Sequence, residues 1–330
     1  MKKTSPLPRA IALVGAGMSK FGAFPDKNSR DLFVEAYKAM RQSVDKGFDP
    51  SEIDAVYVGN FSSGLFEGQS HTAPIMADSV GLVPRPAVRV ENACASGATA
   101  LRQGIMAIVS GMADIVLVGG AERMTALPTS RVTDTLAVAG DVEYEIPAGF
   151  TFPGFYAAMA SAYIHRYGMR PEHLMRVAQK NHDNGALNPN AQFSSTIAGW
   201  MESRKAAARR KGKPVPTWQD EMEFFRDDRA NPMIAWPLRL FDCSPITDGA
   251  ACLLIVAGET AHNFTDYPIY ITGSGQATDY PLHDRADLTA LASARKASQI
   301  AYDMAGVTPQ DIRIAEVHDC FTIAEVIATE

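Results

Sequence analysis

The chain has 330 residues, of which 46% are hydrophobic and 21% charged, and its formal net charge is −6. This length and apolar content are enough for one large domain or two fused domains with a hydrophobic core. The charge balance gives no basic excess that would favour nucleic acid or an anionic membrane surface. No segment approaches the ~20 apolar residues of a membrane-spanning helix, and the N-terminus has no apolar stretch of signal-peptide length. We therefore expect a cytoplasmic protein with no membrane or nucleic-acid partner.

Four cysteines are present, and their spacing limits what they do. None belongs to a C-x-x-C pair, so a zinc or iron–sulfur site is not expected. A disulfide scaffold is not expected either, because the chain is long and poor in cysteine. Each cysteine is read as a small buried hydrophobe unless its context indicates otherwise. The four are Cys94, Cys243, Cys252 and Cys320.

The first 122 residues alternate between strand-like and helix-like segments. Short apolar runs ending in glycine or polar residues predict strands, and apolar residues at helical spacing predict helices, the first with Ser29 as its N-cap. This alternation is typical of an α/β domain with a mostly parallel sheet. Strands are predicted at residues 10–17, 54–61, 87–93 and 114–119, and helices at 29–44 and 95–110.

Residues 123–245 differ from the alternating part. They are rich in Pro, Asn, Met and aromatic residues, and they predict a loop-and-helix excursion. Within it, Ser203–Lys213 holds six basic residues, which form either a solvated helix face or a patch for phosphate groups or a partner protein. The strand–helix pattern then resumes, with strands predicted at 250–257, 267–273 and 311–317 and a helix at 289–305.

An internal repeat relates the two ends of the chain. A shift of 259 residues carries residues 50–61 onto 309–320, and nearly the same shift carries strand 11–15 onto 269–273. Two halves of similar order predict a duplicated fold. The counterparts of the segment up to residue 122 would extend to roughly residue 381, so we expect the sequence to continue beyond Glu330.

Cys94 stands where a predicted strand meets a helix of small residues, within Val88–Ala98. A thiol at a helix N-terminus feels the positive end of the macrodipole, which favours the thiolate. The small residues that follow leave space for a bulky thioester, and backbone N–H groups of the turn can hold an oxyanion. The alternative interpretation is a packing cysteine in a tight turn.

A second group of chemically useful residues closes the last predicted strand, at His318 and Cys320. By the repeat it occupies the position of residues 59–61, and polar groups at the ends of parallel strands face the crevice where α/β proteins bind ligands. His318 can donate to an oxygen and Cys320 can exchange a proton. Taken alone, this group is equally compatible with a metal-binding or structural role.

Five motifs together resemble the thiolases. The His-Asp-Cys-Phe form is similar to the sterol-carrier-protein-X type and its archaeal and bacterial acetyl-CoA acetyltransferase-like relatives. The resemblance implies an α/β thiolase fold in five α-β-α-β-α layers, with duplicated βαβ halves and an inserted loop domain. The motifs are Asn92–Gly97, Gly119–Glu122, Phe152–Tyr156, Asp242–Ala250 and His318–Phe321.

The implied domains follow from this resemblance. Residues 1–122 and 246–266 would form the N-terminal half, and 123–245 the substrate-binding loop domain. Residues 267–330 would form a C-terminal half that is incomplete. The segment 199–231 is longer than is usual for the family. The additional residues would contact a partner protein or accommodate a bulky acyl group.

The resemblance also implies roles for individual residues. Cys94 would be the acylated nucleophile, Cys320 the acid/base cysteine, and His318 a group lining the oxyanion hole. Ser244 would contact the pantetheine arm, with the segment that holds Phe152, Phe155 and Tyr156 shaping the acyl pocket. The family's Gly-His-Pro motif, whose histidine activates the nucleophile, does not occur in this sequence. We expect it beyond Glu330.

The implied activity is ping-pong cleavage of a β-ketoacyl-CoA with CoA, or the reverse Claisen condensation. CoA and acyl-CoA are substrates, and no metal or redox cofactor is expected. A homodimer or tetramer is expected, with a small zinc-ribbon/OB-fold protein as a further partner. The alternatives are an aldolase-like relative, against which Cys94 argues, and a ketoacyl or hydroxymethylglutaryl synthase, against which Cys320 argues. A catalytically incomplete scaffold subunit stays open because the Gly-His-Pro histidine is absent.

Overall fold

The computed structural model describes residues 6–330; residues 1–5, which belong to the segment where no signal peptide is predicted, lie outside the described residues. The chain forms two compact units, each described here by itself. The sheet unit comprises residues up to Thr135, Ile246–Thr278 and Ser293–Arg313, and the helical unit comprises Leu136–Pro245, Asp279–Ala292 and Ile314–Glu330. Residues 267–330, expected to form one half of a duplicated fold, are divided between the two units. The assignment of duplicated halves stays a prediction.

The sheet unit is built on one six-stranded sheet with the order β3-β2-β4-β7-β1-β8. Strand β2 runs parallel to β3 and β4, whereas β7 runs antiparallel to both β4 and β1, and β8 runs antiparallel to β1. The predicted mostly parallel sheet is therefore wrong. The chain leaves the end of β4 and re-enters the sheet at the same edge, where Arg123 pairs with Asp248, so β7 must run back along β4. The strands are β1 (Ile11–Met18), β2 (Ala55–Gly59), β3 (Ala87–Val90), β4 (Ile115–Arg123), β7 (Asp248–Ala257) and β8 (Ile269–Tyr270).

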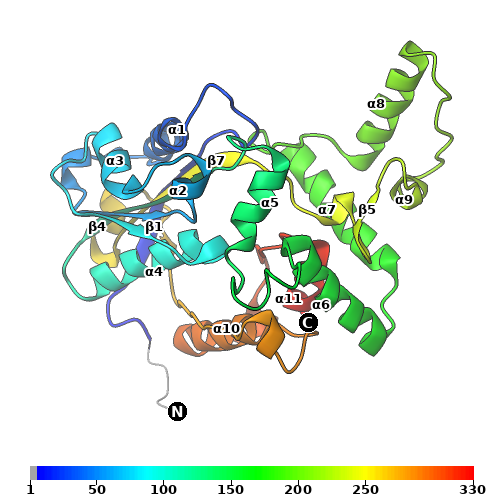
Figure 1. Cartoon of the computed structure of the whole chain (residues 1–330). Helices are drawn as coiled ribbons and strands as arrows, with labels where there is room; N and C mark the ends of the chain where they lie inside the picture. The colour runs from blue at the N-terminus through cyan, green and yellow to red at the C-terminus, as the bar shows by residue number, and fades with distance from the viewer. Residues whose placement is uncertain (1–5) are drawn as a thin grey trace. The chain divides into compact units, whose positions relative to one another are not determined.

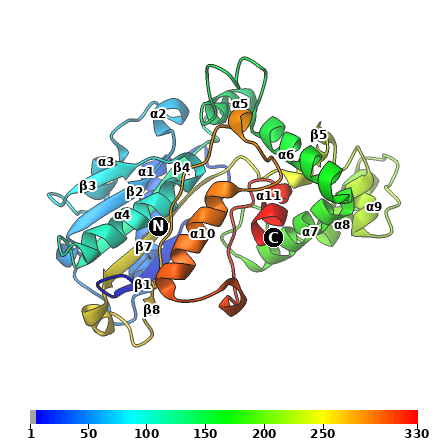
Figure 2. The same cartoon turned by 90° about the horizontal axis from the view of Figure 1, so that it is seen from below.

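Helices cover both faces of this sheet (Figures 1 and 2). Helices α1 (Ser29–Gln42) and α3 (Thr72–Ser79) share one hydrophobic cluster with Leu117 of β4. Helix α4 (Ser96–Val109) lies on the other face and shares a second cluster with Val116 and Val118. Successive side chains of a strand point to opposite faces, so a continuous apolar run such as that of β4 serves a sheet covered on both sides.

The N-cap of the first helix lies one residue earlier than predicted. Asn28, not Ser29, is the N-cap: its side chain accepts a hydrogen bond from Asp31 N, and the Asp31 carboxylate accepts one from Asn28 N, both at 3.0 Å. This reciprocal pair is a capping box, which satisfies two N–H groups at the helix start. Ser29 is the first helical residue and is buried.

The predicted strand at 311–317 is wrong, and the one at 267–273 is reduced to the two residues of β8. A strand needs a neighbour to pair its backbone groups, and within residues 6–330 no strand pairs with 311–317. Its side chains are correspondingly exposed, Ile314 to 86%. The intervening helix α10 (Ala292–Ala305) forms close to its predicted place.

The helical unit holds two separate hydrophobic clusters. The first joins α6 (Phe152–Tyr167) to α11 (Thr322–Thr329). The second, which we call the α8–α9 core, joins α7 (Pro171–Leu187) to α8 (Ile197–Arg210) and α9 (Glu221–Arg226). The remaining elements are α2 (Ser63–Phe66), α5 (Thr129–Ala137), which crosses the boundary of the two units, and the hairpin of β5 (Met233–Ala235) and β6 (Leu238–Arg239). Among the described residues no helix is long and apolar enough to cross a membrane.

The start of α4 packs directly on the end of β2, and this contact can be tested at Gly59. A Cβ placed on Gly59 would lie 2.6 Å from Gly97 N, which is backbone and cannot move without shifting α4. We expect Gly59→Ala to lower the free energy of unfolding by about 1–3 kcal/mol, because overpacking forces the helix away from the strand. The measurement is urea unfolding. Gly97→Ala is the matched control, since a Cβ there meets no atom within 4 Å, and an equal loss in both variants would contradict the prediction.

Candidate functional site

The predicted site residues fall in both units. Cys94 belongs to the sheet unit, and the remaining predicted residues belong to the helical unit.

Cys94 occupies a strained turn between β3 and α4. It lies in the single 3₁₀ turn Ala93–Ala95, and Ala93 has a φ of +44°, a left-handed conformation that is uncommon for a residue with a side chain. The Ser96 hydroxyl holds the turn by accepting from Asn92 N at 2.9 Å and donating to Ala93 O at 2.7 Å. Strained backbone persists where its surroundings over-determine it, and it is frequent at functional sites.

The environment of Cys94 does not favour the thiolate. The residue as a whole is exposed, yet crowding by neighbouring protein atoms and, secondarily, the negative charge of Glu122 raise the pKa of its thiol. Desolvation therefore outweighs the lowering of the Cys94 pKa that was expected from its position at a helix start. The N–H groups of Ala95 and Ser96 are engaged with Asn92 O and Ala93 O, so these two are not offered to an oxyanion. Forming the thiolate of Cys94 consequently requires a group that removes its proton.

Glu122, at the end of β4, is a residue for which the sequence predicted no role. Its carboxylate accepts hydrogen bonds from Phe61 N at 2.7 Å, from Asn60 Nδ2 at 3.1 Å and from Ser62 N at 3.3 Å. The Asn60 amide is almost fully buried and also donates to Ser63 Oγ at 2.6 Å. Burial raises the pKa of Glu122 to about 7 despite these bonds. The only sequence signal was the position of Glu122 within the Gly119–Glu122 motif.

In the helical unit, the chain around Cys320 is fixed by the segment that precedes β7. Phe321 forms an isolated β-bridge with Cys243, and Ser244 N donates to Cys320 O at 2.9 Å. Just beyond, the buried Thr322 hydroxyl donates to the Asp242 carboxylate at 2.9 Å. Asp242 is only 5% exposed, and desolvation raises its pKa. Two of the predicted motifs, Asp242–Ala250 and His318–Phe321, are thus brought together.

Aromatic side chains from α6 line the same place. Tyr156 stacks on Phe321 with ring centroids 4.6 Å apart, and Phe152 stacks on Tyr156 at 6.5 Å. Phe155 lies behind them, 8% exposed, and packs edge-on against Phe152. Phe152 and Tyr156 are half-buried, so their rings stay partly accessible, while the buried Phe155 supports Phe152 from the core.

The other predicted residues of this group differ in setting. His318 and Ser244 are exposed, and Cys320 is half-buried. Between His318 and Cys320, the Asp319 carboxylate accepts from the Asn181 amide of α7, which anchors the motif to that helix. Cys243 is half-buried, and desolvation raises the pKa of its thiol to about 12, so it stays protonated.

Two further features lie away from these residues. Cys252 is fully buried in β7, as a packing cysteine, and desolvation raises the pKa of its thiol.

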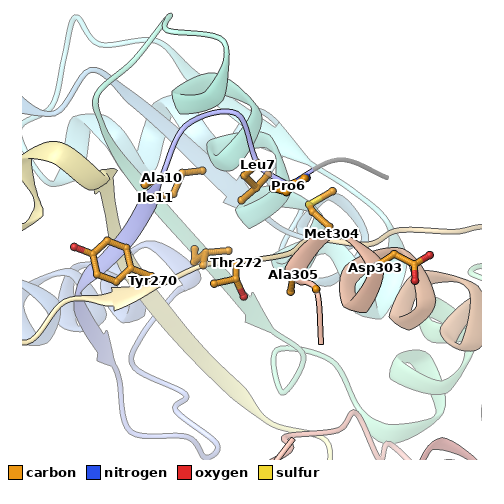
Figure 3. A pocket seen from close by; sticks show the side chains of 11 residues that line it. Pro6, Leu7, Ala10, Ile11, Tyr270, Thr272, Asp303, Met304 and Ala305 are labelled. Atoms are coloured by element: carbon orange, nitrogen blue, oxygen red, sulfur yellow. The ribbon is translucent and has the colours of Figure 1, made fainter. Parts of the chain in front are cut away.

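A cavity of about 440 Å³ opens beside Leu7, Tyr270 and Met304 (Figure 3). This cavity adjoins the start of β1, and Ile11 of β1 lies level with the start of β4. Glu122 is near the end of β4, so the cavity lies at the opposite end of the strands from Glu122. In the described part of the chain, no group of three His, Cys, Asp or Glu residues has the arrangement of a metal site.

Comparison with known families decides the assignment. The "Thiolase, N-terminal domain" family matches residues 11–259, and the "Thiolase C-terminal domain-like" family matches residues 274–330. The chain belongs to the thiolase family. The predicted recognition is confirmed.

Relatives of this thiolase point the same way. It is 40% identical over 323 residues to an acetyl-CoA acetyltransferase of Methanothermobacter thermautotrophicus, covering 98% of this chain and 76% of the relative. It is 28% identical to the benzoylsuccinyl-CoA thiolase subunit BbsB of Thauera aromatica, covering 98% and 75%. The solved structure of an Ltp2-ChsH2(DUF35) aldolase matches with a TM-score of 0.75 at 24% identity, covering 98% and 76%, which supports the fold. The α/β thiolase fold is confirmed, and the chain is an acyltransferase enzyme, as predicted.

The buried bond between Thr322 and Asp242 is expected to stabilise the helical unit. Thr322→Val keeps the shape of the side chain but leaves a buried carboxylate oxygen without its donor. We expect a loss of about 1–3 kcal/mol in the free energy of unfolding, measured by urea titration. Thr329→Val is the control, because Thr329 is exposed and donates only to carbonyls of its own helix. An equal loss of stability in both variants would show that the bond from Thr322 to Asp242 does not contribute to the free energy of unfolding.

The titration of Glu122 predicts a pH dependence of stability. Its pKa is about 7 in the folded chain and 4.5 ordinarily, so between these pH values the folded state binds a proton that the unfolded state lacks. The free energy of unfolding therefore falls as pH rises from about 4.5 through 7. Relative to Glu122→Gln, the melting temperature of the wild type should fall across that range. Parallel melting-temperature profiles for the two proteins would contradict the assignment.

Proposed function

We propose that this thiolase cleaves a β-ketoacyl-CoA with CoA, or runs the reverse condensation, through a covalent acyl group on Cys94. The observation that carries the proposal is the strained turn that presents an exposed Cys94 at the start of α4. The 40% identity to an acetyl-CoA acetyltransferase supports acetyl-CoA as one of the acyl partners.

The proposed cycle has two half-reactions. In thiolysis, a base removes the Cys94 proton and Sγ attacks the keto carbon of the substrate. The bond between that carbon and the α-carbon breaks, and its electron pair remains on the departing acetyl-CoA as an enolate. Cys320 donates a proton to this enolate. The thiolate left on Cys320 then takes the proton of the CoA thiol, whose sulfur attacks the acyl-Cys94 thioester. The shortened acyl-CoA is released, the thiolate of Cys94 is regenerated, and Cys320 is again protonated.

The surroundings of Cys320 support its proposed role. Ser244 N donates to Cys320 O, and the Asn181 amide donates to the Asp319 carboxylate, so the motif is held on both sides of the thiol. The exposed His318 would donate to the enolate oxygen of the acetyl-CoA fragment. Phe152 and Tyr156 would contact the acyl chain, and the exposed Ser244 would contact the pantetheine arm.

The assembly of the enzyme is part of the proposal. A homodimer or tetramer, a small zinc-ribbon/OB-fold partner and a cytoplasmic location follow from the resemblance of its motifs. CoA serves as substrate.

The central test is acylation of Cys94. Wild-type protein mixed with acetoacetyl-CoA in the absence of free CoA should gain the mass of one acetyl group, located by peptide mass spectrometry on the peptide that holds Cys94. Cys94→Ala should abolish both this adduct and turnover, because no other thiol replaces the nucleophile. Cys252→Ala is the control, since the buried Cys252 takes no part in the proposed chemistry, and it should retain the adduct.

Two outcomes would contradict the proposal. Turnover that persists in Cys94→Ala would indicate chemistry without an acyl-enzyme, as in an aldolase-type reaction. A correctly folded wild type that forms no adduct with acetoacetyl-CoA or longer β-ketoacyl-CoA substrates would indicate a scaffold subunit.

A further inference from the structure

Three chain segments of the sheet unit meet at one edge of the sheet. Strand β2 pairs in parallel with β3 and β4, so that Gly59 lies level with Val90 on one side and with Gly120 on the other. Three neighbouring strands therefore end at the same edge of the sheet. The end of β2 leads into its turn, the end of β3 leads into the turn that holds Cys94, and the end of β4 carries Glu122. The sheet register brings them together.

The carboxylate of Glu122 holds the turn after β2. Two backbone N–H groups, those of Phe61 and Ser62, point at it at the start of α2, and the buried Asn60 amide adds a third donor. Asn60 itself bridges to Ser63 Oγ and to Ala121 O. These bonds fix the turn to β4 through one side chain.

The same carboxylate acts electrostatically on Cys94. A Cβ placed on Gly59 would lie 2.6 Å from Gly97 N, so the backbone at the end of β2 packs directly against the start of α4, just after Cys94. Desolvation is the largest influence on the pKa of the Cys94 thiol and raises it, the backbone N–H of Cys94 lowers it, and the charge of Glu122 raises it further. A negative charge near a thiol opposes formation of the thiolate.

We propose that Glu122 is a positioning residue that fixes the turn after β2 beside Cys94 and, by gaining or losing its proton, controls how readily the Cys94 thiol ionises. This inference rests on the proposed role of Cys94 as nucleophile and deepens it. A protonated Glu122 removes the opposing charge, so protonation of Glu122 and ionisation of Cys94 favour each other. The two groups titrate as a coupled pair.

Other charged groups around Glu122 also influence its pKa. Arg89 of β3, whose Nε donates to Asn60 O at 3.1 Å, lowers the pKa of Glu122, and Glu67 after α2 raises it. Glu67 is itself accompanied by Arg123, at 3.8 Å. Burial is the largest influence and brings the pKa to about 7, so both protonation states of Glu122 are populated at neutral pH.

The experiment measures the reactivity of Cys94 directly. Alkylation by iodoacetamide is followed by mass spectrometry of the Cys94 peptide from about pH 6 to about pH 10, because the thiolate is the reacting form. In Glu122→Gln the midpoint of the profile should move to lower pH by roughly half a unit, which makes alkylation about threefold faster below the midpoint. Glu122→Asp keeps the charge and should leave the midpoint close to that of the wild type.

A matched control separates this effect from general charge removal. Glu91 is three residues from Cys94 but exposed, and its carboxylate accepts from Ala93 N at 2.6 Å. Glu91→Gln should leave the midpoint unmoved, since water screens its charge. An unshifted profile in Glu122→Gln, even with lowered thermal stability, would reduce Glu122 to a structural residue and overturn the inference. An equal shift in Glu91→Gln would overturn it as well.

The acylation test keeps this inference distinct from the proposed function. If Cys94 is alkylated with the expected shift but never acylated by acetoacetyl-CoA, the proposed function fails and the coupling to Glu122 stands. If Cys94 is acylated while the alkylation profile of Glu122→Gln is unshifted, the proposed function stands and the inference fails.

Discussion

The parallel register of β2 with β3 and β4 is the constraint on which the candidate nucleophile depends. Parallel strands end at the same edge of a sheet, so the polypeptide that follows each strand is delivered to one place. Gly59 then allows α4 to approach β2 at backbone distance, and the strained turn at Ala93 joins β3 to the start of α4. The position of Cys94 is therefore set by the sheet itself.

Buried and half-buried carboxylates connect distant segments in both units. Glu122 ties β4 to the turn after β2, and Asp242 ties the segment before β7 to α11. Asp248, fully buried, accepts from Thr125 N at 2.8 Å and from Phe24 N at 3.1 Å. Burying a carboxylate is costly unless its oxygens are hydrogen-bonded, and each of these accepts at least two bonds. Each such group makes the relative placement of the joined segments specific, because a displaced segment would leave a charged oxygen without a donor.

The sequence predicted the strands and helices of the sheet unit well where apolar runs were long and covered on both faces, as for β4 and α1. It failed where tertiary pairing decides the outcome. The direction of β7 depends on where the excursion returns, and residues 311–317 have strand-like composition but no partner strand within the described chain. The motifs located Cys94 and the chain around Cys320 but predicted no role for Glu122. The contacts of Glu122 are with residues about 60 positions away in the sequence. Composition at a single position does not encode such contacts, and the same holds for the raised pKa of Cys94.

The α8–α9 core has a consequence for how this part of the enzyme can vary. Phe224 and Phe225 are fully buried in a cluster formed mainly by α7, α8 and α9, with Phe241 packed against it. The link between α8 and α9, residues 211–220, carries no regular structure and is largely exposed. Lengthening or shortening such a link changes the free energy only weakly, since loop closure depends on the logarithm of length. This segment is therefore a place where evolution or protein engineering can insert new sequence, while the strand register that presents Cys94 is left untouched.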